Sequence, residues 1–288
     1  MNLSHVIERR FEAVVQRHDW RDCALYALSL GMGSDPLDED ELPYVYEGRA
    51  QRVVPSQCVV TGWPAFWHAD PAAEIDWVRI LHGEERFMLH KPMPLDAEIR
   101  ADHSVRAVVD KGPGRGALIY FDTELSDVRT GERLASLCST QFLRGDGGCG
   151  SHGVAPVEEA PLPAGLEPCA RIDYRTPPQA ALLYRLASRD YMPLHADPEV
   201  ARRAGFDRPI SHGLNTMGLA CRAVLKHRAR RGPEWLRSMF VRFAQPAYPG
   251  ETIRVELFEE GDRVRFRARA LERDAVVLDR GECCFGSH

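Results

Sequence analysis

The segment from Leu183 to Gly218 constrains the fold most, because proline and glycine residues interrupt it at short intervals. Pro193 fixes its own φ and biases the residue before it away from the α region, which predicts a turned loop from Asp190 to His195. Asp197, followed by a proline, then predicts the N-cap of a short helix. A longer apolar helix should run from about His212 to about Arg230.

Asp190 and His195 lie five positions apart in the predicted loop. A carboxylate and an imidazole that share one water molecule can divide its two proton transfers. The helix that begins at Gly213 adds free backbone N–H groups, which can stabilise a developing negative oxygen. We therefore predict an active site for acyl groups, with Asp190, His195 and Gly213 as its catalytic residues. For this spacing taken alone, a solvated polar pair in a surface loop is the alternative.

Four neighbours of the predicted acid–base pair are candidate substrate-binding residues: Ser188, Arg189, Met192 and His212. Ser188 could also form local hydrogen bonds, and we expect no catalytic role for it. His212 precedes the long helix, where a side chain that packs or caps is the favoured interpretation. Arg189 could meet a carboxylate on an unusual substrate.

Composition narrows the class of protein and the partners. The chain has 288 residues, 44% of them apolar and 27% charged, which is typical of one large or two ordinary globular domains. A net charge of −5 argues against nucleic acid as the main partner. We find no apolar run long enough to span a membrane, no apolar signal core in residues 1–21 and no Ser-Lys-Leu ending, so we expect a cytoplasmic protein.

Eight cysteines are scattered along the chain, and none forms a C-x-x-C pair. We expect reduced thiols and no metal site. The acidic loop from Asp35 to Glu41 does not have the spacing of a calcium loop either.

Two halves with similar patterns flank a segment rich in glycine and proline. Residues 1–144 contain strand-like stretches, including 53–60 and several between 77 and 143, after an N-terminal region that suggests a weak amphipathic helix through Phe11, Val14 and Val15. Residues 145–168 are predicted to be a linker. Residues 169–288 contain the predicted loop from Asp190 to His195, called here the active loop. They also contain the long helix and strands at 238–243, 251–259, 263–272 and 275–285.

A short internal repeat in the sequence suggests a duplication of the fold. Pro92-x6-Ile99-Arg100 matches Pro246-x6-Ile253-Arg254, although a chance match is a serious rival. His82-Gly83 and His212-Gly213 stand at very different distances before these motifs. If they mark equivalent places, the first half lacks the long helix and has interior volume that could house an acyl tail.

The segment from Leu183 to Gly218 resembles the hydratase 2 signature of MaoC-like (R)-specific enoyl-CoA hydratases. The resemblance extends over nearly the whole chain and includes Ala24-Leu25-Tyr26-Ala27-Leu28, Gly33-Ser34-Asp35-Pro36-Leu37, Tyr44-Val45-Tyr46-Glu47, His82-Gly83-Glu84, Leu143-Arg144-Gly145, Val241-Arg242-Phe243 and Tyr248-Pro249-Gly250-Glu251-Thr252. It implies an α+β double hotdog, in which two antiparallel sheets each wrap around a helix. It also implies a non-catalytic first half that accommodates the acyl chain, and a catalytic second half with the full central helix. The CoA thioester would be the substrate, with no cofactor, and the protein would be a homodimer.

Two residues depart from the family pattern, which usually reads Ser-Gly-Asp-x-Asn-Pro-Leu-His. Arg189 stands where a glycine is expected, and Met192 stands where an asparagine normally helps to arrange the site. Loss of that amide should cost rate or change the substrate. Two alternatives to hydration therefore stay open: a hotdog thioesterase, and an acyl-CoA-binding protein without catalytic activity.

Overall fold

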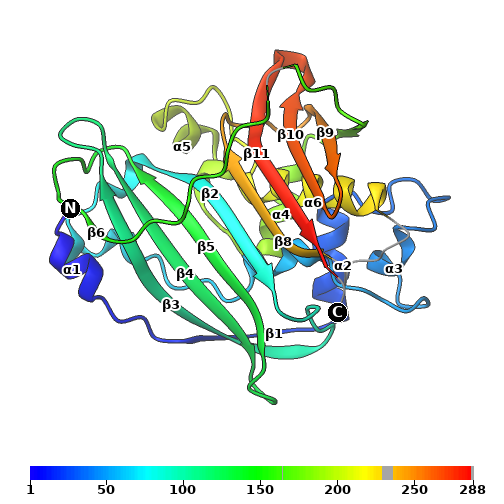
Figure 1. Cartoon of the computed structure of the whole chain (residues 1–288), viewed down its shortest axis with the longest axis horizontal. Coiled ribbons are helices and arrows are strands. Elements are labelled where there is room, and N and C mark those ends of the chain that lie inside the picture. Colours follow the sequence, from blue (N-terminus) through cyan, green and yellow to red (C-terminus); the bar gives the residue numbers. More distant parts are fainter. Residues whose placement is uncertain (164, 229–235, 287–288) are drawn as a thin grey trace.

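The fold is built on one antiparallel sheet that curves around a central helix (Figure 1). The computed structural model describes residues 1–163, 165–228 and 236–286 of the chain. Within these residues the sheet has eleven strands, in the order β1-β3-β4-β5-β2-β8-β11-β10-β9-β7, with β6 paired to β3. The strands are β1 Val14–His18, β2 Ile80–Leu89, β3 Ala97–Asp110, β4 Ala117–Asp127, β5 Arg133–Leu143, β6 His152–Gly153, β7 Ala170–Arg175, β8 Leu236–Phe243, β9 Thr252–Glu260, β10 Arg263–Ala270 and β11 Ala275–Phe285.

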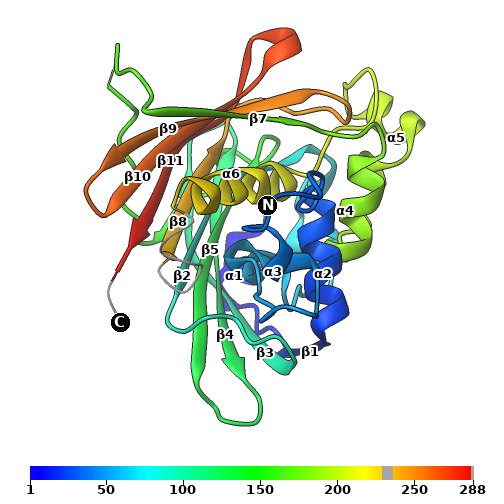
Figure 2. The same ribbon diagram turned by 90° about the vertical axis from the view of Figure 1, so that its right-hand side faces the viewer.

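Helices cover the concave side of the sheet and the ends of its strands (Figure 2). The α-helices are α1 Leu3–Glu8, α2 Trp20–Ser29, α3 Leu42–Val45, α4 Ala180–Ser188, α5 Pro198–Arg203 and α6 Gly213–His227. Short 3₁₀ helices are η1 Pro55–Val60, η2 Trp67–Ala69, η3 Pro71–Ala73, η4 Trp77–Arg79, η5 Pro193–His195 and η7 Leu271–Arg273. No helix in the described part of the chain has the length and apolar character needed to cross a lipid bilayer.

The two half-sheets predicted from the sequence are present, and they are joined edge to edge. β2 of the first half pairs with β8 of the second half, from Glu84 opposite Arg242 to Met88 opposite Ser238. Each half-sheet therefore has one exposed edge fewer. Exposed edges are a hazard in open sheets because other chains can pair with them. The joint makes the two halves one continuous body of hydrogen-bonded strands.

The central helix α6 is mainly apolar, and its buried residues run without a break from Leu214 to Leu225. A helix with this pattern must be enclosed on every side. It lies inside the curve of the second half-sheet, with α2 and α4 beside it (Figure 2). We predicted this helix to end near Arg230, but α6 ends at His227 and residues 229–235 lie outside the described part.

The first half has no long helix of this kind, as expected from the sequence. The ten-residue α2 and the 3₁₀ helix η1 take its place. The predicted strand over residues 53–60 is wrong, because Pro55 begins η1 and every residue of η1 is buried. An apolar run enclosed on all sides has no alternation that separates a strand from a helical turn.

The N-terminal prediction is also corrected. α1 ends at Glu8, and Val14 and Val15 belong to β1, which pairs with β3. β-branched side chains favour strands, and the edge of β3 offers hydrogen-bond partners that the sequence does not reveal.

The predicted linker, residues 145–168, contacts both half-sheets in its described part. β6 pairs with β3, and the Glu159 carboxylate lies 3.1 Å from the Arg86 guanidinium. Glu158 similarly pairs with Arg280 of β11 at 2.5 Å. The segment is thus held to both half-sheets by polar contacts, and its role as a linker between two domains stays a prediction.

A buried ion pair also links the halves. Arg222 of α6 donates hydrogen bonds to both carboxylate oxygens of Glu41, at 2.5 and 2.8 Å, and to the Leu30 carbonyl at 3.0 Å. Its guanidinium lies over the ring of Tyr174. A buried charge is tolerated only with such full pairing, so this contact fixes the position of α6 against the loop after α2.

Candidate active site

The candidate site begins at the C-terminal end of α4, where the chain turns abruptly. Arg189 follows the helix in the left-handed region, with φ of 60°, and turns the chain toward Asp190. The Asp190 N–H donates to Ser188 Oγ at 3.2 Å, and the Met192 N–H donates to Asp190 Oδ1 at 3.1 Å. These two bonds fold the loop and hold the carboxylate. The side chain of Asp190 keeps 34% of its surface exposed, so it remains accessible to a ligand.

His195 ends the 3₁₀ turn η5 that begins at Pro193, as the proline predicted. Its Nδ1 lies 2.9 Å from the carbonyl oxygen of Ile210. A carbonyl only accepts, so Nδ1 carries the proton and Nε2 has the free lone pair. Burial lowers the pKa of His195 below its ordinary value, although the Asp190 charge acts in the opposite direction. The imidazole is therefore a neutral base near pH 7.

His212 is the N-cap residue of α6 and is only 2% exposed. Its ring stacks on that of His195, with centroids 3.8 Å apart. Nε2 of His212 lies 3.3 Å from the Asp190 carbonyl oxygen and 4.0 Å from Oδ2 of the same residue. The pKa of His212 is lowered to about 3, mainly by burial and secondly by the neighbouring His195. The ring packs at the helix start, as favoured from the sequence, but it also forms one wall of the site.

Three polar side chains predicted from the sequence thus come together. One carboxylate oxygen of Asp190 and one ring nitrogen each of His195 and His212 lie within 4.8 Å of one another. A single water molecule can reach two groups at such a separation. These donor types could also hold a divalent cation, so the expectation of no metal stays a prediction, as do the catalytic roles.

Gly213 is the first residue of α6 and is partly exposed. The first N–H groups of an α-helix have no carbonyl within the helix to bond, so the Gly213 N–H is available to a ligand. A Cβ at this position would lie 3.0 Å from the ring of Phe243 on β8. Glycine is therefore required by a close approach between the helix start and the sheet.

The other predicted substrate-binding residues have different surroundings. Ser188 is completely buried and serves the local turn. The Arg189 side chain is 45% exposed, with a guanidinium nitrogen 3.8 Å from Asp22 Oδ1 on α2. Met192 is half-buried, and its backbone, rather than its side chain, contacts Asp190. Contact of these residues with substrate stays a prediction.

Sequence reasoning missed the aromatic support behind the histidines. The Tyr184 ring lies 5.1 Å from the His212 ring and 6.0 Å from that of Tyr26 on α2, and both tyrosines are fully buried. Tyr184 lies on α4, but the left-handed turn at Arg189 separates it from Asp190, so helical periodicity does not relate the two residues. Tyr26 and Phe243 come from distant elements and had no local signal.

A cavity of about 240 Å³ lies in the first half, against the start of η1. It is lined by Gln51, Arg52, Val53, Pro55, Leu89, Pro92, Met93 and Leu95. Gln51 Nε2 donates to the carbonyl of Trp20 at the start of α2, the same end of α2 where Asp22 lies beside Arg189. One wall of the cavity and Arg189 therefore both lie near the start of α2.

Comparison with known proteins identifies the family of the chain. Residues 160–279 match the family described as MaoC like domain, and residues 17–145 match the MFE-2 hydratase 2 N-terminal domain. The chain is 36% identical to "Enoyl-CoA hydratase 2, peroxisomal" of Arabidopsis thaliana, over 90% of this chain and 87% of the relative. The chain belongs to the MaoC-like hydratase 2 family.

Other relatives in the hydratase 2 family extend this result. The chain is 32% identical to "Peroxisomal multifunctional enzyme type 2" of Drosophila melanogaster over 93% of its length, but it spans only 46% of that protein. The crystal structure of a MaoC-like dehydratase from Phytophthora capsici matches with a TM-score of 0.86 and 29% identity, over 100% of both chains. A Mycobacterium tuberculosis protein described as a double hotdog fold matches over 96% of this chain and 97% of that one, with a TM-score of 0.56 and 15% identity. The predicted double hotdog is thereby confirmed.

Proposed function

We propose that this protein catalyses the reversible hydration of a trans-2-enoyl-CoA to a (R)-3-hydroxyacyl-CoA. The observation that carries the proposal is the convergence of Asp190 and His195 within 4.8 Å, next to the start of α6. The names of relatives in the hydratase 2 family support the reaction class. A member of this family would need the three functions that the site offers: a base, a group to orient water and an oxyanion donor.

In the proposed step, His195 Nε2 removes a proton from water as the water oxygen bonds to Cβ of the enoyl group. Asp190 orients the water by accepting a hydrogen bond from its other hydrogen. The electron pair of the double bond moves to Cα and the thioester oxygen. The imidazolium then returns its proton to Cα, so that one water is added and the protein is unchanged. The Asp190 charge stabilises the imidazolium in between.

The thioester oxygen gains negative charge as the enolate forms. We place it at the Gly213 N–H, where the positive end of the α6 dipole adds to the hydrogen bond. One oxyanion donor of this kind is worth about 3 kcal/mol of barrier.

We further propose that the cavity in the first half receives the acyl chain. Its lining is mainly apolar, and Gln51 in its wall bonds to the start of α2, where Asp22 lies beside Arg189. Filling it with Met93→Trp should raise KM for long-chain enoyl-CoA while crotonyl-CoA hydration changes little. Equal loss with both substrates would reject the cavity as an acyl site.

The hydration assignment is tested by the loss of enoyl absorbance with crotonyl-CoA, followed by chiral analysis of the product. Asp190→Asn and His195→Gln should each lower kcat by at least about 10²-fold, the usual contribution of a positioned acid or base. Asp197→Asn is the matched control, because that aspartate lies in the same segment but only caps α5. Near-normal hydration by either site variant would reject the assignment.

The two rival functions are separated by other readouts. A thioesterase would release free CoA thiol with no hydroxyacyl product. A non-catalytic binder would hold acyl-CoA without turnover. Met192 lacks the side-chain amide of the usual asparagine, but its backbone N–H donates a hydrogen bond to Asp190 Oδ1.

We infer that the protein works as a cytoplasmic homodimer and needs no cofactor beyond its CoA substrate. All eight cysteines are free thiols, which suits a reducing compartment. The helices α2 and α4 pack against each other and carry four exposed leucines that a second copy could cover: Leu25, Leu28, Leu182 and Leu186. Size-exclusion chromatography with light scattering tests the dimer. Dialysis against a chelator tests the need for a metal cofactor, and we expect full activity afterwards.

A further inference from the structure

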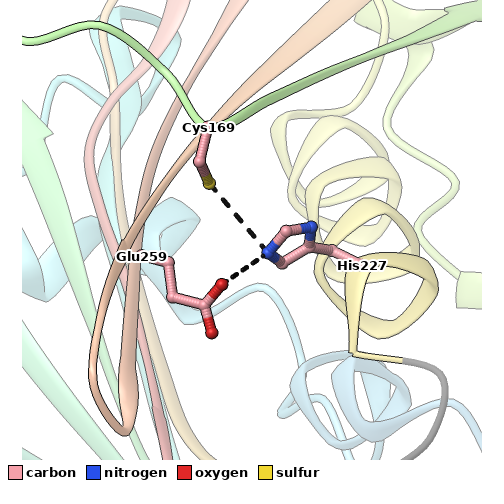
Figure 3. A group of neighbouring side chains, drawn as sticks. All are labelled: Cys169, His227 and Glu259. Carbon is pink, nitrogen blue, oxygen red and sulfur yellow. Dashed lines mark hydrogen bonds and ion pairs between the residues drawn. The ribbon is translucent and has the colours of Figure 1, made fainter.

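A second cluster of polar side chains lies at the opposite end of α6 from the candidate active site (Figure 3). Cys169 immediately precedes β7, His227 is the last residue of α6, and Glu259 lies near the end of β9. The Cys169 Sγ is 4.0 Å from His227 Nε2, which is 3.0 Å from Glu259 Oε2. α6 has 15 residues, so about 20 Å separate this cluster from Gly213.

The direction of the His227 ring decides between two interpretations of the cluster. In a nucleophilic relay, one imidazole nitrogen faces the thiol and the other faces the acid. Here Nε2 faces both the thiol and the carboxylate (Figure 3). Three donor atoms within 4.8 Å of one another suit a shared cation better than a proton relay. The Cys169 thiol, which here donates to the Leu257 carbonyl at 3.2 Å, would lose its proton to the solvent on binding the cation.

The donor set and its spacing fit a metal ion that accepts sulfur. Thiolate, imidazole and carboxylate together are typical ligands of zinc. Tetrahedral zinc with ordinary bond lengths places neighbouring donor atoms about 3.4 to 3.6 Å apart. All three atoms lie within 4.8 Å of one another. The distance from Nε2 to Oε2, 3.0 Å, is shorter than the separation expected around zinc, and the distance from Nε2 to Sγ, 4.0 Å, is longer. Small side-chain rotations would complete the geometry.

The surroundings also favour a cation at this position. The C-terminal end of α6 has partial negative charge from its free carbonyls. The second oxygen of Glu259, Oε1, lies 2.5 Å from the Arg228 guanidinium, which also donates to the Gly261 carbonyl at 2.6 Å. An outer contact of this kind orients a ligating carboxylate. The two anionic ligands offset the charge of the cation beside this arginine.

We propose that Cys169, His227 and Glu259 bind a divalent cation of the zinc class and thereby tie the start of β7 to the ends of α6 and β9. Solvent would fill the fourth position, because Cys169 and Glu259 are exposed. The proposal is independent of the proposed hydration, since the two sites lie at opposite ends of α6.

Titration of the full chain with Zn²⁺, after removal of metal by a chelator, tests the proposal. Calorimetry should give one tight site per chain, and Co²⁺ should give the absorbance band of a thiolate-bound ion. Cys169→Ser and His227→Gln should each weaken zinc binding more than about 100-fold, beyond the loss typical of outer contacts. Cys149→Ser, which removes another partly exposed thiol, is the matched control and should bind zinc normally.

The candidate active site has donor groups of its own, so the experiment includes His195→Gln. Zinc binding that persists in His195→Gln and is lost in Cys169→Ser supports the proposal. Loss in His195→Gln alone would overturn it, as would no binding in the micromolar range. A Co²⁺ complex of the unaltered chain without a thiolate band would also overturn it, whether or not the variants fold. Crotonyl-CoA hydration by Cys169→Ser should equal that of the unaltered chain.

Discussion

The imidazole rings of His195 and His212 stack with centroids 3.8 Å apart and planes 27° apart, and both rings are buried. Two charged rings at this distance would repel each other without water to screen them. The pair is therefore neutral in the folded protein. This neutrality makes His195 a base and also makes the fold sensitive to acid.

The acid limb of catalysis should lie below the ordinary histidine pKa. His195 must be neutral to accept a proton, and burial lowers its pKa from 6.5. The protein should therefore keep its kcat/KM as pH falls through 6.5 and lose it only at lower pH. A pH profile with crotonyl-CoA, with folding followed by fluorescence at each pH, gives the measurement. A limb at or above pH 6.5 would contradict the neutral pair.

The same burial predicts that acid destabilises the fold through His212. Its pKa is about 3 in the folded state and 6.5 as an ordinary value, so the unfolded chain binds more protons between these values. Stability then rises with pH in this window and is lost as pH falls from about 6.5 toward 3, by up to about 1.4 kcal/mol per pH unit. Urea unfolding of His212→Asn should show a flatter slope over this range. An unchanged slope would mean that another group carries the acid sensitivity.

Arg189→Gly should stabilise the protein by about 1 kcal/mol. Arg189 adopts φ of 60°, where any residue with a Cβ is strained and glycine is not. The ion pair lost, at 3.8 Å to Asp22, is exposed and contributes little. Arg185→Gly is the matched control within α4, where glycine should instead cost about 1 kcal/mol. Chemical unfolding that shows the same sign for both variants would rule out strain at Arg189.

Gly213→Ala should lower kcat by up to about 10²-fold, because the added Cβ meets the Phe243 ring at 3.0 Å and moves the N–H from the oxyanion position. The second change Phe243→Leu would make room, so the double variant should recover much of the rate. Phe243→Leu alone serves as the control. No recovery in the double variant would mean that alanine acts through something other than this contact.

Local sequence determined the active loop. Pro193 imposes its φ on the turn, Asp197 accepts from the first N–H groups of α5, and Gly213 begins α6, all as predicted. These features depend on residues a few positions apart, whose dihedral preferences act whatever the rest of the chain does. The four C-terminal strands were also recognised near their observed limits, because their alternation or apolar character is read within a single segment.

Tertiary structure alone decided the features that depend on distant partners. Residues 55–60 form η1 rather than a strand because they are enclosed beneath α6, and Val14 and Val15 form a strand because the edge of β3 lies beside them. The pairing of β2 with β8 and the stack of His212 on His195 likewise join residues that no local pattern relates. Packing and hydrogen-bond energies of this kind exceed intrinsic propensity. The sequence therefore specifies which groups can act, and the folded surroundings set their charge and direction.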